Sequence, residues 1–423
     1  MSSSVGSRGE ILDLIARRRD GWAMPGGFYA HPGVYDADME YLFRRQWVFV
    51  GHSCQVKNPG DFFTVTIGND PLILMRADDG QLRALYNVCR HRGTLLCWDD
   101  CGHTRRLTCP YHQWSYERDG SLASCRGMHD QVQDQQLDLL QAHLQELEGM
   151  LFVCLAESPP DFTAASELIG PVAAPQGMAD AKVAKIVDYE IAANWKLVWE
   201  NNRECYHCNV NHPQYIKANF DHFNQDDTTE QVQERIDQQT RRSEEKWQHQ
   251  GLAASHRSTG MALFPDADQD LWYSANRTVL VEGYISESMD GQQVAPLMGD
   301  YPDPDVGTLR IRTMPNFWNH SSCDHVVSTR LLPTGPGSTQ ARVYWLVHPD
   351  AEEGKDYQLE TLMPFWQLTS EQDWELCEFA QRGVQSNGYR PGPLSIHKEY
   401  NVDGFIRWYL QQLERGLTED PSG

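Results

Sequence analysis

Two short segments, each with one cysteine and one histidine, combine residue types and spacing that suggest metal chemistry. Cys89 and His91 form a C-x-H pair, and Cys109 and His112 form a C-x-x-H pair further along the chain. Thiolate and imidazole groups bind zinc, copper and the iron of iron–sulfur clusters, so the ligand types alone leave the metal open. A zinc finger usually groups its cysteines and its histidines separately, whereas two mixed pairs can give one iron two cysteines and the other two histidines. The pattern therefore favours a [2Fe-2S] cluster over zinc or over an accidental alignment of buried thiols and turn histidines.

A second set of candidate ligands follows the N-cap residue Asn194. A helix from Asn194 would place Glu204 and His207 on one face, where the carboxylate can accept a hydrogen bond from the imidazole. Pro213 disfavours a helical conformation at His212, so the helix is expected to end or distort there and to let His212 turn toward the metal of His207. Two histidines and one carboxylate form the facial triad of a mononuclear ferrous site, which leaves positions open for O₂.

The carboxylate of this triad has two candidates in the C-terminal part of the chain. Asp373 is the first choice, and Glu371 is the runner-up. By spacing alone, Ser370 and Asp373 are more readily explained as a capping box at the start of a helix over 370–385. The residues themselves therefore leave the third ligand undecided.

Two kinds of sequence pattern must position these residues. Short β-rich segments separated by Gly and Asp turns run from about residue 49 to residue 155, and longer amphipathic segments alternate with strands after Pro159 and Pro160. We predict an N-terminal segment over 1–47 that packs with the larger domain, a small antiparallel domain over 48–158 and the larger domain over 159–423. Helices are expected over 370–385 and 402–417, and the polar stretch 228–250 is expected to be a solvated helix or a mobile insertion. Strands are predicted over 62–67, 71–76, 82–88, 106–109, 150–155, 278–285, 308–314, 326–332 and 341–348.

Composition and charge argue against several classes of partner. The chain has 423 residues and a net charge of −23, which disfavours nucleic acid and anionic membranes and weakly favours the approach of a cationic small molecule. No apolar run approaches the roughly 20 residues that a membrane-spanning helix needs, and no signal peptide is recognisable, so a cytoplasmic location is expected. In that reducing compartment the 11 cysteines are expected to be free thiols or metal ligands rather than a disulfide framework.

The run C-R-H-R-G from Cys89, followed by C-P-Y-H-Q-W-S-Y from Cys109, resembles the Rieske domain of aromatic-ring hydroxylases and related oxygenases. The resemblance implies that Cys89, His91, Cys109 and His112 hold a Rieske [2Fe-2S] cluster. The implied fold is α+β, with a small all-β Rieske domain near the N-terminus and a larger helix-grip catalytic domain. The resemblance also implies that five neighbouring residues support the cluster or pack below it: Arg90, Arg92, Gly93, Trp114 and Tyr116.

The second set of ligands resembles the catalytic domain of the same family. The pattern E-C-Y-H-x4-H-P begins at Glu204, and a Q-R-G element follows Asp373 at a matching distance. The resemblance implies that His207, His212 and Asp373 hold a mononuclear Fe(II). It also implies that Glu204, for which family members often have Asp, links His112 of one subunit to His207 of the neighbouring subunit in a cyclic homotrimer.

A fuller resemblance, over nearly the whole chain, is to the oxygenases of this family that act on quaternary ammonium compounds such as glycine betaine, stachydrine and carnitine. It is carried by 200–208, 288–291, 318–320, 345–348 and 381–383, and it departs at Asn211, 276–280 and 292–306. The resemblance implies a terminal monooxygenase component that uses O₂ to hydroxylate an N-methyl group, so that demethylation releases formaldehyde. Electrons would come from NAD(P)H through a separate flavin and iron–sulfur reductase. Aromatic residues available to bind the methylated cation by cation–π attraction are Trp199, Tyr206, Trp272, Tyr273, Phe317 and Trp318.

Other classes of function make different demands on the chain. A Rieske ferredoxin needs only the first set of ligands and leaves most of the chain unexplained. An interaction protein stapled by zinc needs neither iron centre. Within the enzyme class, the alternative is an oxygenase that hydroxylates an aromatic or another small molecule.

Overall fold

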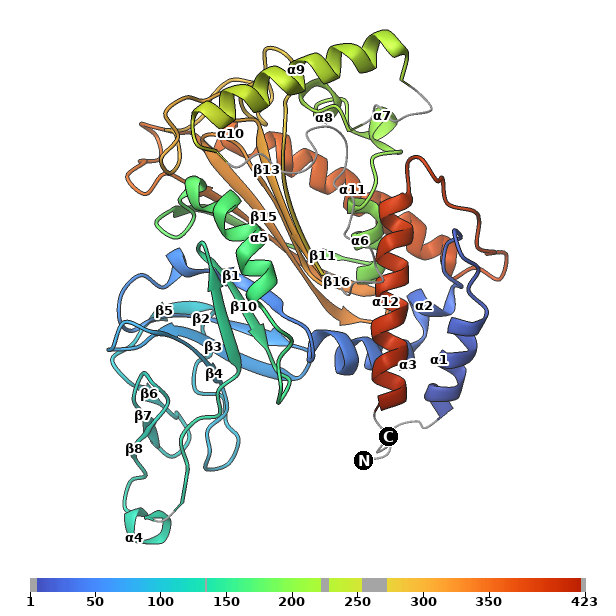
Figure 1. Cartoon of the computed structure of the whole chain (residues 1–423). Helices are drawn as coiled ribbons and strands as arrows, with labels where there is room; N and C mark the ends of the chain where they lie inside the picture. The colour runs from blue at the N-terminus through green and yellow to red at the C-terminus, as the bar shows by residue number, and fades with distance from the viewer. Residues whose placement is uncertain (1–5, 134, 222–227, 253–271, 420–423) are drawn as a thin grey trace. The chain divides into compact units, whose positions relative to one another are not determined.

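The computed structural model of the chain describes residues 6–133, 135–221, 228–252 and 272–419. The chain divides into two compact units, one formed by Phe43–Asp161 and the other by Met1–Leu42 with Phe162–Gly423 (Figure 1). The predicted α+β class is confirmed, because the first unit is built of small sheets and the second combines helices with an antiparallel sheet. Among the helices that the structure describes, none has both the length and the apolar character that a membrane crossing requires.

The smaller unit, which we call the β unit, contains three antiparallel sheets with the strand orders β1-β10-β9, β4-β3-β2-β5 and β6-β7-β8. Leu85 on β4 and Leu107 on β6 pack in one apolar cluster with Cys89 and Cys109. The loops that follow these two strands are therefore held by a common core. The strands are β1 (Val48–His52), β2 (Asp61–Ile67), β3 (Asp70–Arg76), β4 (Leu82–Tyr86), β5 (Cys101–His103), β6 (Leu107–Thr108), β7 (Ser115–Tyr116), β8 (Leu122–Ser124), β9 (His143–Leu147) and β10 (Met150–Cys154), with a short helix α4 (His129–Val132).

The larger unit is built on a six-stranded antiparallel sheet with the order β11-β16-β15-β14-β13-β12. The predicted strands over 308–314, 326–332 and 341–348 are found, but the strand expected over 278–285 is wrong because β12 ends at Thr278. The chain then turns through Gly283, which has a positive φ of 93°. The strands are β11 (Lys182–Ile191), β12 (Tyr273–Thr278), β13 (Thr308–Thr313), β14 (Phe317–Ser321), β15 (His325–Gly335) and β16 (Ser338–Val347).

One face of this sheet carries the residues that approach the candidate site. The register places Trp345, Val327, His320 and Arg310 side by side on β16, β15, β14 and β13, and residues paired in register project from the same face. Trp345 and Val327 pack in one cluster with Trp366, which lies on helix α11 (Pro364–Val384). Helix α11 therefore covers this face and contributes the opposite wall of the site.

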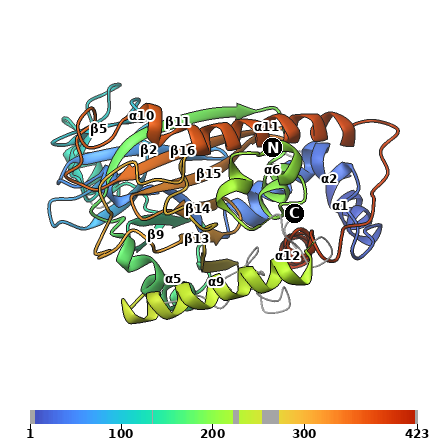
Figure 2. The same cartoon turned by 90° about the horizontal axis from the view of Figure 1, so that it is seen from above.

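The remaining helices of the larger unit surround the sheet. Figure 2 shows α11 alongside β11 and α9 on the other side of the unit, whereas α12 lies beside the N-terminal helices. The polar stretch over 228–250 is a helix, α9, capped by the side chain of Thr229 and anchored by buried Trp247. The helices are α1 (Gly6–Ala16), α2 (Gly27–Ala30), α3 (Pro32–Asp38), the π-helical turn Met39–Phe43, α5 (Thr163–Ala173), α6 (Trp195–Asn202), α7 (Cys208–Asn211), α8 (Tyr215–Ala218), α9 (Glu230–His249), α10 (Leu359–Leu362), α11 (Pro364–Val384) and α12 (Tyr400–Glu419).

A buried polar cluster around Asp38 fixes helix α6, which leads into the candidate site. The Asp38 carboxylate accepts hydrogen bonds from the indole of Trp195 at 2.9 Å and from the hydroxyl of Tyr409 at 2.7 Å. It also pairs with the ammonium group of Lys196, and both charged side chains are fully buried. These contacts join α3, α6 and α12, so the position of α6 depends on groups that lie far apart in the sequence.

The substitution Tyr409→Phe is expected to lower the free energy of unfolding by about 1.5–3 kcal/mol, because a buried carboxylate loses one donor without a change of shape. Tyr389→Phe is the matched control. The Tyr389 hydroxyl donates to the neutral carbonyl of Met24 at 2.9 Å, so its loss should cost only about 0.5–1.5 kcal/mol. Urea denaturation of the two variants measures the difference, and equal losses would show that the Asp38 cluster does not carry the extra stability.

Glu200 makes the stability of the larger unit depend on pH. Its carboxyl group accepts a hydrogen bond from Tyr29 at 2.9 Å, and complete burial raises its pKa from 4.5 to about 8, although Tyr29 and Lys196 oppose this shift. Because the folded pKa exceeds the unfolded one, the folded state gains stability from the bound proton below pH 4.5 and loses it as the pH rises through about 8.

In Glu200→Gln this titration is absent. Between about pH 5 and about pH 9, the native protein should therefore lose a few kcal/mol of unfolding free energy relative to the variant. Urea denaturation midpoints across that range measure the shift. A difference that stays constant with pH would contradict the assignment, and Glu190→Gln, on β11, is the control for removing a carboxylate elsewhere in the unit.

Candidate metal centres

The two Cys/His pairs of the β unit are brought together by tight turns. After β4, the amide of Gly93 donates to the carbonyl of Cys89 at 2.9 Å, and after β6 the amide of Gln113 donates to the carbonyl of Cys109 at 3.0 Å. Both sulfurs are buried, and the rings of His91 and His112 lie 4.7 Å apart. The predicted set therefore converges, because the two cysteines share one apolar cluster and the two imidazoles lie side by side.

The histidine nitrogens of this set are available to bind a metal. The Nδ1 atoms of His91 and His112 are buried and have no hydrogen-bond partner among the described residues. A buried polar atom without a partner costs about 1–3 kcal/mol, which coordination to iron would remove. The donor set itself suits zinc as well as a [2Fe-2S] cluster.

Aromatic residues support the two ligand loops. The ring of Trp114 stacks on His91 with the centroids 4.9 Å apart, and the hydroxyl of Tyr116 lies 3.5 Å from the Cys89 sulfur. The same hydroxyl accepts a hydrogen bond from the amide of Arg90 at 3.0 Å. Trp114 and Tyr116 thus contact two candidate ligands directly, and they restrict the orientation of both members of the Cys89/His91 pair.

The segment that carries Glu204 and His207 is a loop rather than a helix. Asn194 caps α6 as expected, since its side chain accepts from the amide of Lys196 at 3.0 Å, but α6 ends at Asn202. The expectation that Glu204 and His207 share a helical face is therefore wrong. Their contact arises because the loop folds back, and Glu204 Oε1 accepts from His207 Nδ1 at 2.5 Å. The predicted break before Pro213 is found, because α7 ends at Asn211.

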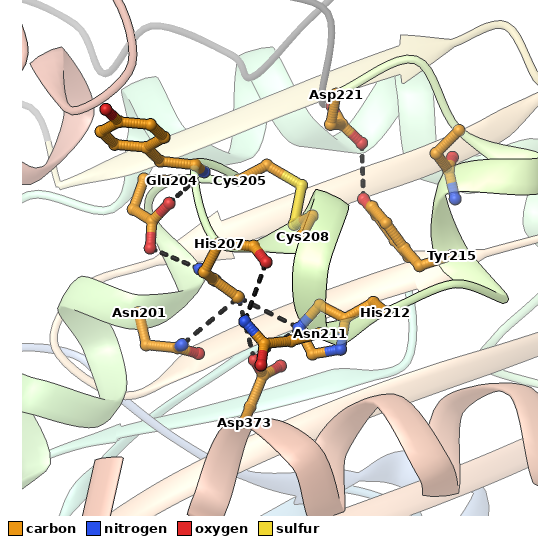
Figure 3. The surroundings of a disulfide bond; sticks show 12 residues. Asn201, Glu204, Cys205, His207, Cys208, Asn211, His212, Tyr215, Asp221 and Asp373 are labelled. Atoms are coloured by element: carbon orange, nitrogen blue, oxygen red, sulfur yellow. Dashed lines mark hydrogen bonds and ion pairs between the residues drawn. A yellow bond between two sulfur atoms is a disulfide. The ribbon is translucent and has the colours of Figure 1, made fainter. Parts of the chain in front are cut away.

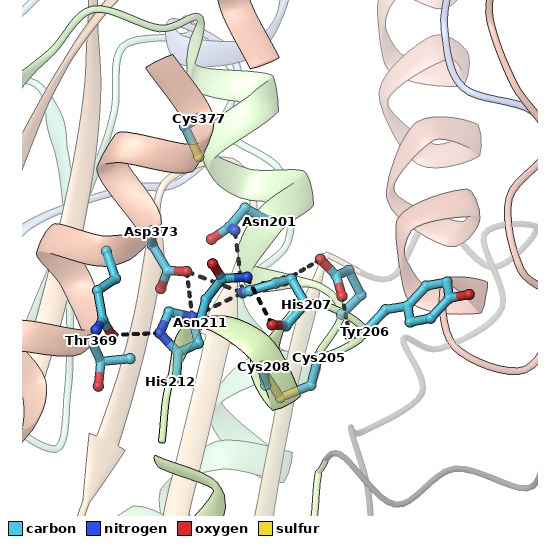
Figure 4. Close-up of polar contacts among 12 residues, drawn as sticks. Asn201, Cys205, Tyr206, His207, Cys208, Asn211, His212, Thr369, Asp373 and Cys377 are labelled. Carbon is cyan, nitrogen blue, oxygen red and sulfur yellow. Dashed lines mark hydrogen bonds and ion pairs between the residues drawn. A yellow bond between two sulfur atoms is a disulfide. The ribbon is translucent and has the colours of Figure 1, made fainter. Parts of the chain in front are cut away.

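Three donor atoms meet at one point in the larger unit. His207 Nε2 lies 3.0 Å from His212 Nε2 and 3.1 Å from Asp373 Oδ1, and His212 Nε2 lies 2.9 Å from the same oxygen (Figure 4). Ligands about 2.1 Å from an octahedral ion and at right angles to each other lie about 3.0 Å apart. The triangle therefore has the size and the chemistry of a two-histidine, one-carboxylate metal site.

Further hydrogen bonds orient the two rings. Glu204 accepts from the outer nitrogen of His207, and Gln372 Oε1 lies 2.8 Å from His212 Nδ1. These contacts direct the Nε2 atom of each ring toward the common point, which is the role that such partners play at metal sites. Burial lowers the pKa of His207, but the carboxylates of Asp373 and Glu204 outweigh burial and raise it to about 10. The site therefore carries a surplus of negative charge that suits a cation.

Asp373 lies in the interior of helix α11. The expected capping box with Ser370 is wrong, because α11 begins at Pro364 and both residues are in its interior. Trp366, Thr369 and Asp373 are separated by three and four positions, so all three line the same side of the helix. The runner-up Glu371 points elsewhere, since it accepts from Gln367 at 2.9 Å. Of the two carboxylates considered, only Asp373 meets the histidines.

The expectation that all cysteines are thiols or metal ligands is wrong for Cys205 and Cys208. They form a disulfide beside His207, with their Cα atoms 5.0 Å apart (Figure 3). The pairing is possible because the chain turns between α6 and α7 instead of continuing as a helix. The Cys208 sulfur lies within 4.8 Å of the ligand atoms of His207 and His212, but in the disulfide it is not available as a thiolate ligand. Asp373 is thus left as the third donor.

A cavity opens beside the triad, and His207, His212 and Asp373 are among its lining residues. Its walls include Tyr215, Trp366 and His320, which come from α8, α11 and β14, together with the buried arginines of β13. The ring of Trp366 lies 4.1 Å from that of His320. The cavity therefore brings aromatic and charged side chains together beside the triad.

The aromatic residues predicted to bind a cation do not line this cavity. Trp199 packs between Trp318 and Phe405 in the core, and Tyr206 is 56% exposed, pointing away from the triad (Figure 4). Sequence reasoning missed Tyr215 and Trp366 instead. The signal that could have found Trp366 is its place about two helical turns before Asp373, on the same side of α11.

Comparison with known proteins adds family information to this geometry. The model of the ring hydroxylating alpha subunit (catalytic domain) matches residues 178–415, and that of the Rieske [2Fe-2S] domain matches residues 46–140. The glycine betaine monooxygenase oxygenase subunit of Chromohalobacter salexigens is 38% identical over 98% of this chain and 92% of its own length. That of Pseudomonas aeruginosa (strain UCBPP-PA14) is 36% identical over 98% and 94%. The carnitine monooxygenase oxygenase subunit of Escherichia coli (strain K12) is 31% identical over 48% and 55%.

Solved structures share the fold at lower identity. A quaternary ammonium Rieske monooxygenase superposes with a TM-score of 0.68 at 22% identity and covers 95% of this chain and 98% of its own. Naphthalene 1,2-dioxygenase from Rhodococcus sp. gives a TM-score of 0.63 at 18% identity, with 97% and 99% covered. The same architecture therefore serves proteins whose names refer to different substrates.

Proposed function

The chain belongs to the ring-hydroxylating alpha subunits that carry a Rieske [2Fe-2S] domain, and we propose on that premise that it oxidises a quaternary ammonium compound of the glycine betaine type. The predictions of a Rieske non-haem iron monooxygenase, of a [2Fe-2S] cluster and of a mononuclear iron are confirmed by this membership. The match to both domains argues against a ferredoxin without a catalytic domain, and the Rieske match favours a [2Fe-2S] cluster over zinc at the first set of ligands. The substrate and the roles of individual residues are the proposal.

We assign Cys89 and Cys109 to one iron of the cluster and His91 and His112 to the other. His207, His212 and Asp373 are assigned to the mononuclear iron. When bound, these groups supply storage of an electron and activation of O₂. The chain's own residues hold the ligand rings in place: Trp114 stacks on His91, and Glu204 and Gln372 accept the outer protons of His207 and His212.

The cavity beside the triad supports a methylated cation as substrate. The aromatic faces of Trp366 and Tyr215 can attract a quaternary ammonium group, a contribution of about 0.5–2 kcal/mol per contact. Several of its other lining residues are charged, which suits a polar substrate better than an arene. The single observation that carries the proposal is that the triad and these two rings line one cavity.

The proposed reaction inserts one oxygen atom of O₂ into an N-methyl C–H bond. Two electrons and two protons reduce the other oxygen atom to water. The product, an N-hydroxymethyl ammonium ion, breaks its C–N bond and gives formaldehyde, a tertiary amine and one proton. A flavin and iron–sulfur reductase would supply the electrons from NAD(P)H, and the terminal oxygenase would work as a homotrimer in which Glu204 links His207 to His112 of the neighbouring copy.

Turnover assays test this function. The reconstituted enzyme, with O₂ and a compatible reductase or chemical electron donor, should release formaldehyde from glycine betaine in proportion to substrate consumed. The same assay with naphthalene and benzoate tests the alternative of ring hydroxylation. If the enzyme oxidised an arene and released no formaldehyde from any methylated ammonium compound, ring hydroxylation would replace the proposed function.

A further inference from the structure

Two arginines of β13 project from the same face of the sheet toward the cavity. Arg310 and Arg312 are separated by two positions, so their side chains share one face, opposite His320 and Trp318 of β14. Both line the cavity that opens onto the triad, and Arg312 is only 3% exposed. Their environments differ in one respect that matters for ligand binding.

Arg310 has a counter-ion inside the protein. Its guanidinium group donates to Asp221 Oδ1 at 2.7 Å and to Asn219 Oδ1 at 2.9 Å. Asp221 in turn accepts a hydrogen bond from the hydroxyl of Tyr215 (Figure 3). This buried charge therefore has a counter-ion and is part of the scaffold of the cavity.

Arg312 has no such counter-ion. Within the described part of the chain, no carboxylate lies within ion-pair distance of it, and its NH1 atom is buried without a hydrogen-bond partner. Its Nε atom makes one long contact, 3.4 Å to Asn202 Oδ1. Burial, with a further contribution from Arg310, lowers the pKa of Arg312 to about 10. A buried cation in this state is destabilising unless an anion completes it.

The carboxylates in and around the cavity already have hydrogen-bond or ion-pair partners inside the protein. Asp221 is paired with Arg310, and Glu204 and Asp373 hold the ligand histidines. Glu287 accepts from Asn219 at 3.1 Å and from Thr308 at 3.0 Å. The anion that Arg312 requires must therefore come from a bound molecule.

We propose that Arg312 binds the carboxylate of the substrate, which makes the substrate class a betaine, with a carboxylate and a methylated ammonium group on one short chain. The planar fork of a guanidinium group matches a carboxylate with two parallel hydrogen bonds. Trp366 and the triad line the same cavity as Arg312, so one molecule can present its carboxylate to Arg312 and its methyl groups to the aromatic wall and the triad. This inference rests on the proposed function and adds the group that selects among quaternary ammonium compounds.

The experiment compares glycine betaine with choline, which has the same trimethylammonium group but no carboxylate. Binding to the holoenzyme is measured by anaerobic calorimetry, and formaldehyde release is measured in parallel. The native protein should bind glycine betaine at least about 10-fold more tightly than choline. In Arg312→Gln, glycine betaine should bind about 10- to 100-fold more weakly, with a larger change in KM than in kcat, whereas choline binding should be unchanged.

Two further variants control the interpretation. Arg342→Gln removes the same charge from β16, where Arg342 pairs with Asp188 outside the cavity, and should leave glycine betaine binding unchanged. Arg312→Lys keeps the charge but loses the fork, so its binding should fall between the native protein and Arg312→Gln. If Arg312→Gln is misfolded and lacks the visible cluster spectrum, Arg312→Lys serves as the test instead. Glycine betaine binding by Arg312→Lys that equals that of the native protein would then overturn the assignment.

The outcomes separate this inference from the proposed function. Equal binding of choline and glycine betaine by the native protein, or unchanged glycine betaine binding in Arg312→Gln, overturns the role of Arg312 even if formaldehyde is formed. Selective binding of glycine betaine that depends on Arg312, without formaldehyde from either compound, supports Arg312 and rejects the proposed function.

Discussion

Asp373→Ala is expected to remove the mononuclear iron and to abolish formaldehyde release, while the visible spectrum of the [2Fe-2S] cluster remains. Asp373 Oδ1 is the corner shared by both histidines in the donor triangle, at 3.1 Å from His207 Nε2 and 2.9 Å from His212 Nε2. Without it, two neutral imidazoles remain, and two ligands without the anionic carboxylate hold a ferrous ion weakly. Iron and acid-labile sulfide analysis, with the spectrum of the same sample, measures the loss.

Glu371→Ala is the matched control for this prediction. Glu371 lies on the same helix two positions before Asp373, and its side chain contacts Gln367 instead of the histidines. This variant should keep the mononuclear iron and most of the activity. If Asp373→Ala retained iron as well as Glu371→Ala does, the third ligand would have to be another group.

Glu204→Gln is expected to keep both metal centres and to lose at least about 100-fold in the rate of coupled turnover, at the upper end of what an orienting partner of a metal ligand contributes. The Glu204 carboxylate accepts from the ring nitrogen of His207 and from the amide of Tyr206. Gln has the same shape, but its amide oxygen is neutral and its NH₂ group cannot accept a hydrogen bond. The orientation of His207 and the proposed link to the partner subunit's His112 should therefore both weaken.

Stopped-flow reoxidation of the reduced cluster by O₂ in the presence of glycine betaine separates the two steps. In Glu204→Gln the cluster should still accept an electron from the donor but should pass it on slowly. Glu204→Asp keeps the negative charge and should retain much more of the coupling. Full turnover in Glu204→Gln would show that Glu204 has no role in electron transfer.

The candidate ligands of both centres could be proposed from the sequence because local spacing limits the choice. The pairs Cys89/His91 and Cys109/His112 lie in short loops, where few other arrangements of four donors exist. His212 was predictable from Pro213, which ends the helix before it. Asp373 needed the resemblance to the family, since the sequence did not reveal that α11 begins at Pro364, six positions before Ser370.

The cavity could not be predicted from local patterns. Tyr215, Trp366 and Arg312 come from two helices and a strand, and only the assembled sheet and helix α11 bring them together. Trp199 and Trp318 have the same residue type as Trp366, but they pack in the core against each other, with Phe405 of α12 beside Trp199 and Trp374 of α11 beside Trp318. The disulfide between Cys205 and Cys208 was missed because a reducing compartment was expected, and because the sequence pattern suggested a helix where the chain forms a turn.

The central claim is that one polypeptide builds two separate iron centres. Its most direct test is the ratio of iron to acid-labile sulfide in protein reconstituted anaerobically, measured beside the paramagnetic resonance spectrum of the reduced sample. We expect about three iron atoms for every two sulfides, together with the rhombic signal of a cluster ligated by histidine and cysteine. Zinc in place of iron, or iron and sulfide in equal amounts at full cluster occupancy, would contradict the claim.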